Sequence, residues 1–343
     1  MSRAPEIPLI DLSPLPGGRD PDPGARAVAR QIGEACRQHG FFYIVGHGLD
    51  PQLFERLDLA SRKFFALPLT EKMSIAMQHG GRAWRGYFPV GGELTSGQPD
   101  LKEGLYLGTE LGSEHPSVQA GLPLHGSNLF PAAVPELRPA VTAYLSALTA
   151  IAHRVMEGVA LSLGLPPSYF YQRYTQDPLI LFRIFNYPPS APGPDGAEGW
   201  GVGEHTDYGL LTILKQDGIG GLQIKTQDRW IEAPVIPESF VCNIGDMLDR
   251  MTGGLYRSTL HRVRNSSGRQ RLSYPFFFDP NFKAVVEAID TSRAPQEDGQ
   301  PRWDRANLHS FQGTYGDYLM QKVGRVFPDL GQTVLPGGSP RKL

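Results

Sequence analysis

The chain has 343 residues, with 33 Lys and Arg against 35 Asp and Glu, and 40% of its residues are hydrophobic. A net charge of −2 excludes the strongly basic surface that nucleic acids require, and no apolar run approaches the ~18–20 residues needed to cross a bilayer. Glycine and proline are abundant, at 40 and 31 residues, without the three-residue period of collagen, so the composition indicates a turn-rich globular protein and favours an enzyme.

The first part of the chain predicts a mixed α and β region. Residues 7–12 (IPLIDL) predict a short strand, and residues 40–45 (GFFYIV) predict a buried one. Two Asp-Pro pairs, at 22–23 and 50–51, each supply a capping aspartate and a first-turn proline, so a helix should follow each pair. A third, short helix is expected near residue 70.

The pattern loosens between about residues 80 and 131, where glycine, proline and serine are frequent. So long an irregular segment inside a compact chain is typical of a functional loop, and we expect it to border the active site. Within it, Lys102 and Glu103 are interpreted as a solvent-exposed pair. The clearest helix of the chain is predicted next, from Pro135 to about residue 163, and Gly164 ends it.

Beyond residue 178 the sequence changes to short apolar strands separated by turns. This pattern is typical of an antiparallel sandwich or barrel. The expected strands are 179–187, 209–215, 221–225, 230–233, 239–244 and 270–279. A last helix is predicted from His309 to about residue 326.

Glu204-His-Thr-Asp207 stands near the start of the strand-rich half. On a strand, residues two apart point to the same face, so His205 and Asp207 can converge on one point. His261 could return from a later turn as a third ligand. Two histidines and one carboxylate on one face of a metal leave open positions, which is the facial triad of non-haem Fe(II) oxygenases. Taken singly, the first two could be a surface histidine and a turn aspartate, and His261 could be a core residue.

Arg271 and Ser273 show the same spacing, so a guanidinium and a hydroxyl should face inward together. This pair suits a carboxylate, because Arg binds one bidentately and Ser adds a donor. A buried Arg without an anionic partner would be costly. The alternative is a structural role, in which Arg271 forms an ion pair with an acid on a neighbouring strand.

Together these residues resemble the Fe(II)/2-oxoglutarate-dependent dioxygenases, specifically the isopenicillin N synthase-like branch. The resemblance extends along nearly the whole chain. Segments similar to that branch are 7–12, 40–48, 181–189, 220–224, 230–234, 243–248 and 256–263.

The resemblance implies a mainly β fold with flanking helices, built on a double-stranded β-helix (jelly-roll) core. It also implies an amino-terminal α/β region over residues 1–120. The dioxygenase core would then span residues 121–343, with the long supporting helix and the carboxy-terminal helix, and both regions would form one compact unit.

The same resemblance assigns the site. Fe(II) would be held by three residues: His205, Asp207 and His261. The co-substrate 2-oxoglutarate would be held by four: Arg271, Ser273, Tyr187 and, as the weakest candidate, Asn186. With O2 and with ascorbate as a stimulant, 2-oxoglutarate would be decarboxylated to succinate and CO2 while a small soluble metabolite is oxidised. Hydroxylation is the expected reaction, but desaturation, cyclisation and fragmentation of 2-oxoglutarate use the same iron site.

Two other functions remain open from the sequence. One is a non-haem iron oxidase of the same fold that does not use 2-oxoglutarate, and the other is a non-catalytic metal-binding jelly-roll protein. Cys36 and Cys242 are the only cysteines, and the first residues do not form a signal peptide, so a cytoplasmic location is expected. No nucleic-acid or membrane partner is expected, and the sequence indicates no oligomeric state.

Overall fold

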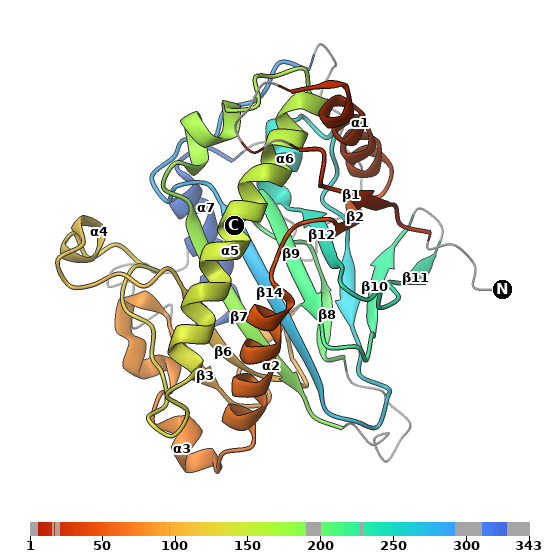
Figure 1. Ribbon diagram of the computed structural model, residues 1–343. Helices are drawn as coiled ribbons and strands as arrows, with labels where there is room; N and C mark the ends of the chain where they lie inside the picture. The colour runs from red at the N-terminus through yellow and green to blue at the C-terminus, as the bar shows by residue number, and fades with distance from the viewer. Residues whose placement is uncertain are drawn as a thin grey trace.

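The structure is a computed structural model, shown in Figure 1, and it describes residues 6–15, 17, 21–95, 97–189, 200–226, 229–291 and 311–327. Its helices are α1 (Pro23–Gln38), α2 (Pro51–Phe65), α3 (Leu69–Met73), α4 (Pro116–Gln119), α5 (Leu137–Ser162), α6 (Asp246–Met251) and α7 (Tyr315–Val326), with shorter helical turns η1 (Met77–Ala83) and η2 (Tyr171–Thr175). Its strands are β1 (Leu9–Asp11), β2 (Phe41–Val45), β3 (Gly86–Phe88), β4 (Leu94–Thr95), β5 (Gln98–Pro99), β6 (Glu103–Gly108), β7 (Leu179–Tyr187), β8 (Val202–His205), β9 (Leu211–Gln216), β10 (Leu222–Lys225), β11 (Trp230–Glu232), β12 (Phe240–Ile244), β13 (His261–Val263) and β14 (Arg271–Asp279).

Two sheets form the core. The larger has the strand order β1-β2-β12-β9-β14-β7-β6-β3, and the smaller has the order β11-β10-β13-β8. Apart from the parallel pair β1 and β2, the pairs within these two sheets are antiparallel. The expected mainly β fold with flanking helices is therefore confirmed, and it is the double-stranded β-helix architecture.

The amino-terminal helices form where local capping signals predict them. Asp22 accepts a hydrogen bond from Ala25 N at 2.8 Å, and Asp50 accepts one from Gln52 N at 3.0 Å. Both helices pack against α5, which crosses the outer face of the larger sheet over β9 and β14 (Figure 1). This helical layer buries one face of the sheet and leaves the opposite face free to line a cavity.

The segment from 80 to 131 is more regular than predicted. It contains β3 and β6, which pair with each other and extend the larger sheet beyond β7. Glycines conceal the strand pattern of β6, yet packing requires one of them: a Cβ at position 104 would lie 2.5 Å from the Phe88 ring. The interpretation of Lys102 and Glu103 as a solvent-exposed pair is wrong, because they are only 1% and 7% exposed.

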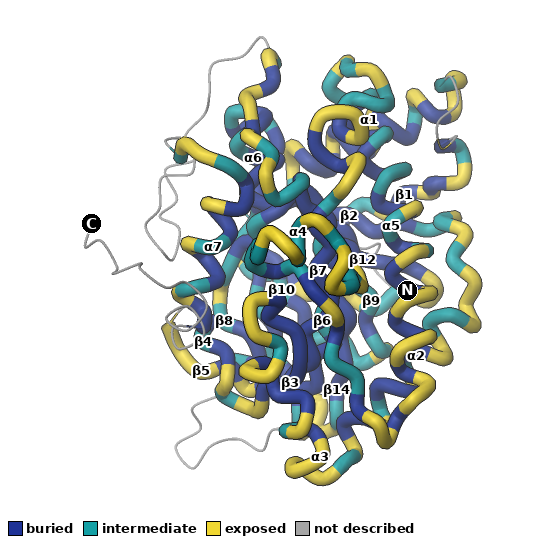
Figure 2. Tube along the Cα trace, turned by 90° about the vertical axis from the view of Figure 1, so that its left-hand side faces the viewer, coloured by how far each residue is buried: buried dark blue, intermediate teal, exposed yellow. Residues whose placement is uncertain are grey.

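The carboxy-terminal helix starts later than predicted. Thr314 and Asp317 form a capping box at the start of α7, so local hydrogen bonding fixes that boundary. His309, where the sequence placed the start, lies outside the described residues. Figure 2 shows that β6, β7 and β14 run through the buried interior, whereas exposed residues gather on the surrounding helices. Within the described ranges, no helix combines the length and apolar character that a membrane span needs.

Candidate active site

Two histidines face each other across a pair of strands in the smaller sheet. His205 ends β8 and lies directly opposite His261, the first residue of β13, with ring centroids 4.2 Å apart. Asp207 follows β8 by two residues, and its Oδ1 lies 3.8 Å from His205 Nε2 and 3.7 Å from His261 Nε2. The three potential ligand atoms all lie within 4.8 Å of one another. The sequence prediction that these residues converge is therefore confirmed.

Backbone carbonyls orient both imidazole rings. His205 Nδ1 lies 2.8 Å from Gly203 O, and His261 Nδ1 lies 3.1 Å from Thr259 O. Protons on the two Nδ1 atoms satisfy these carbonyls and leave the Nε2 lone pairs for a metal ion. Burial and the neighbouring His261 lower the pKa of His205 to about 3, so this imidazole is neutral and able to ligate at neutral pH.

The carboxylate of Asp207 is held by its other oxygen. Oδ2 accepts hydrogen bonds from Thr212 Oγ1 and from Asn243 Nδ2, the latter at 2.7 Å. Thr212 and Asn243 lie on β9 and β12 of the larger sheet. Oδ1 is therefore free to join the two Nε2 atoms. Two imidazoles and one carboxylate form the donor set of a divalent transition metal with open coordination positions.

Arg271 begins β14 and is fully buried in the cavity between the sheets. Its Nε donates to Gly220 O, and its guanidinium carbon lies 4.6 Å from the centroid of the Tyr187 ring, the cross-strand neighbour on β7. Neither NH1 nor NH2 has a hydrogen-bond partner among the described residues. A buried guanidinium with two unpaired nitrogens fits an anionic ligand that is not part of the chain.

Ser273 and Tyr187 lie beside this guanidinium. Ser273 follows Arg271 on the same face of β14, and its Oγ donates to the Tyr187 hydroxyl at 3.5 Å. Arg271 makes no ion pair with an acid in the part of the chain that the structure describes. The alternative in which Arg271 serves a neighbouring strand's carboxylate therefore has no support here. The cluster offers a fork of donors and a hydroxyl, as a carboxylate requires.

Asn186 does not lie with the other predicted residues. Side chains alternate along β7, so Asn186 points to the face opposite Tyr187 and does not line the cavity. There its Nδ2 donates to Glu103 Oε1 at 2.7 Å, and Glu103 also binds Lys72 at 2.7 Å. The prediction that Asn186 contacts the co-substrate is corrected accordingly: the residue belongs to a buried polar network behind the sheet.

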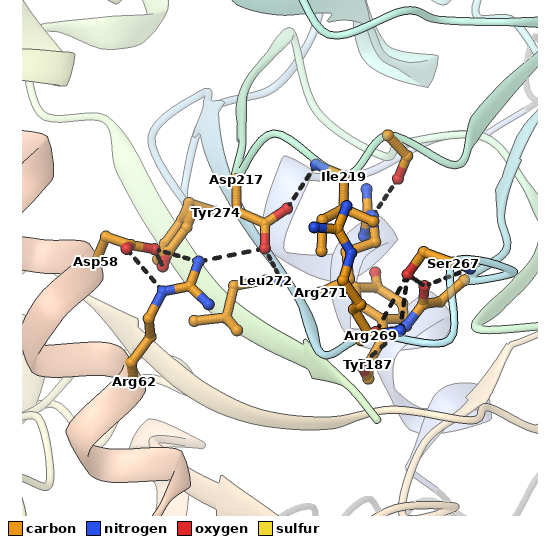
Figure 3. Close-up of polar contacts among 12 residues, drawn as sticks. Asp58, Arg62, Tyr187, Asp217, Ile219, Ser267, Arg269, Arg271, Leu272 and Tyr274 are labelled. Atoms are coloured by element: carbon orange, nitrogen blue, oxygen red, sulfur yellow. Dashed lines mark hydrogen bonds and ion pairs between the residues drawn. The ribbon is translucent and has the colours of Figure 1, made fainter. Parts of the chain in front are cut away.

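Asp217 was missed by sequence reasoning, yet it sets the position of Arg271. The residue follows β9. Its Oδ2 accepts a hydrogen bond from Leu272 N and forms an ion pair with Arg62 of α2 (Figure 3). Arg62 in turn binds Asp58, which also accepts from the hydroxyl of Tyr274 at 2.6 Å. No local pattern marks Asp217, because its partners are distant in the sequence.

The cavity between the sheets contains about 1020 Å³ of space not filled by protein atoms, part of it open to solvent. Besides the residues above, four charged side chains line it: Glu93, Lys102, Arg183 and Asp279. None was assigned a role from the sequence, although Glu93 and Lys102 lie in the segment 80–131 that was expected to border the active site. Arg183 and Asp279 could have been found from strand alternation, because they lie four residues from Tyr187 and eight from Arg271, on the same faces.

Comparison with known families gives two matches along the chain. Residues 7–133 match the family described as non-haem dioxygenase in morphine synthesis N-terminal. Residues 171–280 match the 2OG-Fe(II) oxygenase superfamily. The second range contains all seven predicted site residues.

Three similar proteins span nearly the full length. A Dictyostelium discoideum protein named probable iron/ascorbate oxidoreductase is 50% identical, over 96% of this chain and 97% of its own. A 1-aminocyclopropane-1-carboxylate oxidase of Dictyostelium mucoroides is 40% identical, over 94% of this chain and 96% of its own. A homoarginine-6-hydroxylase of Oryza sativa subsp. japonica is 39% identical, over 92% and 96%.

A solved structure has the same fold. A full-length Neurospora crassa protein, crystallised in complex with alpha-KG (2-oxoglutarate) and thymine, superposes with a TM-score of 0.76 at 28% identity. The alignment covers 93% of this chain and 96% of that one.

Proposed function

The chain belongs to the 2OG-Fe(II) oxygenase superfamily, and we propose that it hydroxylates a small metabolite while 2-oxoglutarate is decarboxylated to succinate and CO2. It is an Fe(II)- and 2-oxoglutarate-dependent enzyme with an HxD…H triad. The observation that carries the proposal is that the triad and the unpaired guanidinium of Arg271 line the same cavity. When bound, Fe(II) supplies the dioxygen chemistry, with ascorbate as a stimulant.

The proposed roles follow from donor chemistry. His205, Asp207 and His261 hold Fe(II), because each directs one unprotonated ligand atom to a common point. Arg271 and Ser273 bind the distal carboxylate of 2-oxoglutarate by charge-assisted hydrogen bonds. Tyr187 packs on the guanidinium and thereby keeps its NH1 and NH2 aimed at that carboxylate. Water is largely excluded at this end, which strengthens each of these interactions.

A small substrate is supported by the position of the triad, which lines a cavity between the two sheets. Two of the relatives named above are named for amino acids, 1-aminocyclopropane-1-carboxylate and homoarginine. Amino acids are therefore the first compounds to screen. Mass spectrometry of the product separates hydroxylation, which adds oxygen, from desaturation or cyclisation, which removes hydrogen.

The division into an amino-terminal region, 1–120, and a core, 121–343, also stands as a proposal. It is supported as one compact unit because β1, β2, β3 and β6 from the first region belong to the same sheet as β7 and β14.

The test uses the purified full chain with Fe(II), ascorbate and 2-oxoglutarate. We expect slow succinate formation without any prime substrate, and we expect His205→Ala to abolish both iron binding and turnover. His79→Ala, which changes an exposed histidine far from the triad in sequence, is the matched control and should change neither. Succinate formation that survives His205→Ala would refute the metal assignment.

A second candidate function is an oxidase of the same fold that does not consume 2-oxoglutarate. The 40% identity to 1-aminocyclopropane-1-carboxylate oxidases favours examining it. The same assay decides between the two. If 2-oxoglutarate neither binds nor yields succinate while substrate oxidation proceeds, the oxidase function replaces the one proposed here. A non-catalytic metal-binding protein would bind iron and form no product with any compound.

A further inference from the structure

Two side chains of opposite charge line the cavity besides those to which the proposed function assigns iron and 2-oxoglutarate. Asp279 ends β14, eight residues after Arg271 on the same face, and Arg183 lies on β7. Strand alternation aims both into the space between the sheets. Burying two charges is costly unless each finds a partner, so their hydrogen bonds indicate what the cavity receives.

Asp279 is 3% exposed and only partly satisfied. Its Oδ2 accepts a hydrogen bond from the Tyr315 hydroxyl of α7 at 2.5 Å. No hydrogen bond from a described residue reaches Oδ1, which lies over Gly209. A Cβ at Gly209 would come within 1.5 Å of that oxygen, so the glycine is what lets the carboxylate occupy this place. Burial raises the pKa of the Asp279 carboxyl to about 7, which a bound cation would reverse.

Arg183 also lacks hydrogen-bond partners within the described ranges. Its guanidinium carbon lies 4.2 Å from the centroid of Tyr106 and 4.9 Å from that of Phe277, so two rings cover its faces. In the described part of the chain it donates no hydrogen bond. Its nearest acid, Glu93, lies 3.6 Å from NH1, beyond hydrogen-bond distance. Its Nε is buried with no hydrogen-bond partner among the described residues.

Glu93 is not free to complete Arg183, because other residues already hold it. Its Oε2 pairs with Lys102 at 2.8 Å, and its Oε1 accepts from the Tyr106 hydroxyl. Lys102 in turn binds Asp100 as well. Glu93 compensates part of the Arg183 charge through the 3.6 Å ion pair, but its closer contacts to Lys102 and Tyr106 leave Arg183, within the described chain, without a hydrogen-bond acceptor, which a carboxylate in the cavity would supply.

We propose that the prime substrate carries a carboxylate that Arg183 binds and a separate cationic group, an ammonium or guanidinium, that Asp279 binds. The proposal deepens the function proposed above and rests on it. It assigns the substrate to the cationic amino acids and their analogues. The pocket is thereby divided along β14, with the 2-oxoglutarate carboxylate at Arg271 and the substrate cation at Asp279.

The strand register places the two charged residues at different levels of the cavity. Ser273 pairs with Phe185 and Phe277 pairs with Leu181, so Arg183 lies level with Pro275. Asp279 is four residues further on, roughly 13 Å along an extended strand, although Arg183 leans toward Phe277. The α-ammonium and α-carboxylate of one amino acid share a single carbon, so a cation further along the side chain fits two receptors on successive parts of the strands better than the α-ammonium does. We therefore place the cation on the side chain.

The experiment compares matched compounds in the succinate assay with the full-length enzyme, Fe(II), ascorbate and 2-oxoglutarate. The cationic set is L-lysine, L-arginine and L-homoarginine. Neutral analogues of the same shape, L-6-hydroxynorleucine, L-citrulline and L-homocitrulline, remove the side-chain charge, and the primary amides remove the carboxylate charge. We expect at least one cationic amino acid to stimulate succinate formation, and its neutral analogue and its amide to do so about tenfold less efficiently in kcat/KM.

Two variants test which residue recognises which charged group of the substrate. Asp279→Asn should reduce the preference for the cationic compound over its neutral analogue by about tenfold, and Arg183→Met should do the same for acid over amide. Asp246→Asn is the control, because Asp246 is an equally buried acid held by a tyrosine of α7, Tyr318, but does not line the cavity. It should change neither preference. Melting temperature and iron content establish that each variant folds.

The assay distinguishes failure of this inference from failure of the proposed function. If substrate-independent succinate formation is present but no cationic amino acid increases it, the substrate class is wrong and the proposed function stands. Equal use of a cationic compound and its neutral analogue by the unmodified enzyme also overturns the assignment of Asp279, whatever the variants do. A preference that persists in Asp279→Asn overturns it as well. Absence of any succinate formation refutes the proposed function and this inference together.

Discussion

Asp217 Oδ2 accepts a 2.6 Å hydrogen bond from the backbone N–H of Leu272, the residue that separates Arg271 from Ser273. The other oxygen of Asp217 accepts from Ile219 N at 3.2 Å, in the turn whose Gly220 carbonyl receives Arg271 Nε. One buried carboxylate thus fixes the start of β14 and the turn that holds the guanidinium (Figure 3). If Arg271 binds the co-substrate as proposed, Asp217 positions the residue that does so.

Asp217→Asn should therefore raise the 2-oxoglutarate concentration needed for half-maximal activity by about tenfold, because a neutral amide accepts more weakly from Leu272 N than a carboxylate does. Iron content should stay unchanged, since the triad lies on other strands. Tyr274→Phe is the control: it removes the bond to Asp58 at the far side of the same network and leaves the Leu272 contact intact. An unchanged requirement in Asp217→Asn would refute the positioning role.

Arg271→Gln should raise the 2-oxoglutarate requirement further, by about a hundredfold, because both nitrogens that bind the carboxylate are removed. Iron should remain bound. Arg269→Gln, two residues earlier and exposed in the preceding turn, should have no effect. An unchanged apparent affinity for 2-oxoglutarate in Arg271→Gln would contradict the role given to this residue.

The same variant, Arg271→Gln, should stabilise the protein when 2-oxoglutarate is absent. Without 2-oxoglutarate, Arg271 is a buried charge whose NH1 and NH2 have no partner among the described residues, so it costs free energy of folding. Arg271→Gln should melt at a higher temperature than the unmodified protein in the absence of 2-oxoglutarate. Adding 2-oxoglutarate should reverse the order, because only the unmodified protein is stabilised by binding it. A lower melting temperature in both conditions would indicate a purely structural arginine.

Substitution of Thr212 tests how the orientation of Asp207 contributes to iron binding. Its hydroxyl donates to Asp207 Oδ2 and so holds Oδ1 toward the two histidines. Thr212→Val keeps the shape but removes the donor, and we expect about a tenfold loss of Fe(II) affinity in a titration. Thr212→Ser keeps the hydroxyl and should retain most of the affinity. Equal affinity in both variants would show that Asn243 alone is sufficient to orient Asp207.

The parts of the fold that depend on neighbouring residues could be predicted from the sequence. The capping aspartates at 22 and 50 act within one helical turn, and the pair 271/273 depends only on strand alternation. The same rule predicted the pair 205/207, although β8 ends at His205 and Asp207 lies just beyond it. The meeting of His261 with His205 is different. It results from pairing between distant strands, which the spacing of residues does not encode, and family resemblance supplied it.

The errors at Lys102 and Asp217 share one physical origin, which is burial by distant partners. Lys102 was interpreted as exposed because a lysine in a glycine-rich segment usually is, but Glu93 and Asp100 compensate its charge in the interior. Asn186 was placed beside its neighbour Tyr187 although alternation puts them on opposite faces. Asp217 carries no local signal at all, because its partners come from α2 and β14.

The buried carboxyl of Asp279 predicts how stability depends on pH in the protein free of metal and ligands. Burial raises its pKa from 3.8 to about 7, offset only in part by the Tyr315 hydrogen bond and by Arg183, while Asp207 adds repulsion. Between about pH 4 and 7 the folded state keeps a proton that the unfolded chain has released, so this group makes stability fall as pH rises through that window. Asp279→Asn carries no such proton. Its melting temperature relative to the unmodified protein should therefore increase from about pH 4.5 to about pH 7 and then level off. A difference independent of pH would show that Asp279 is already ionised in the folded protein.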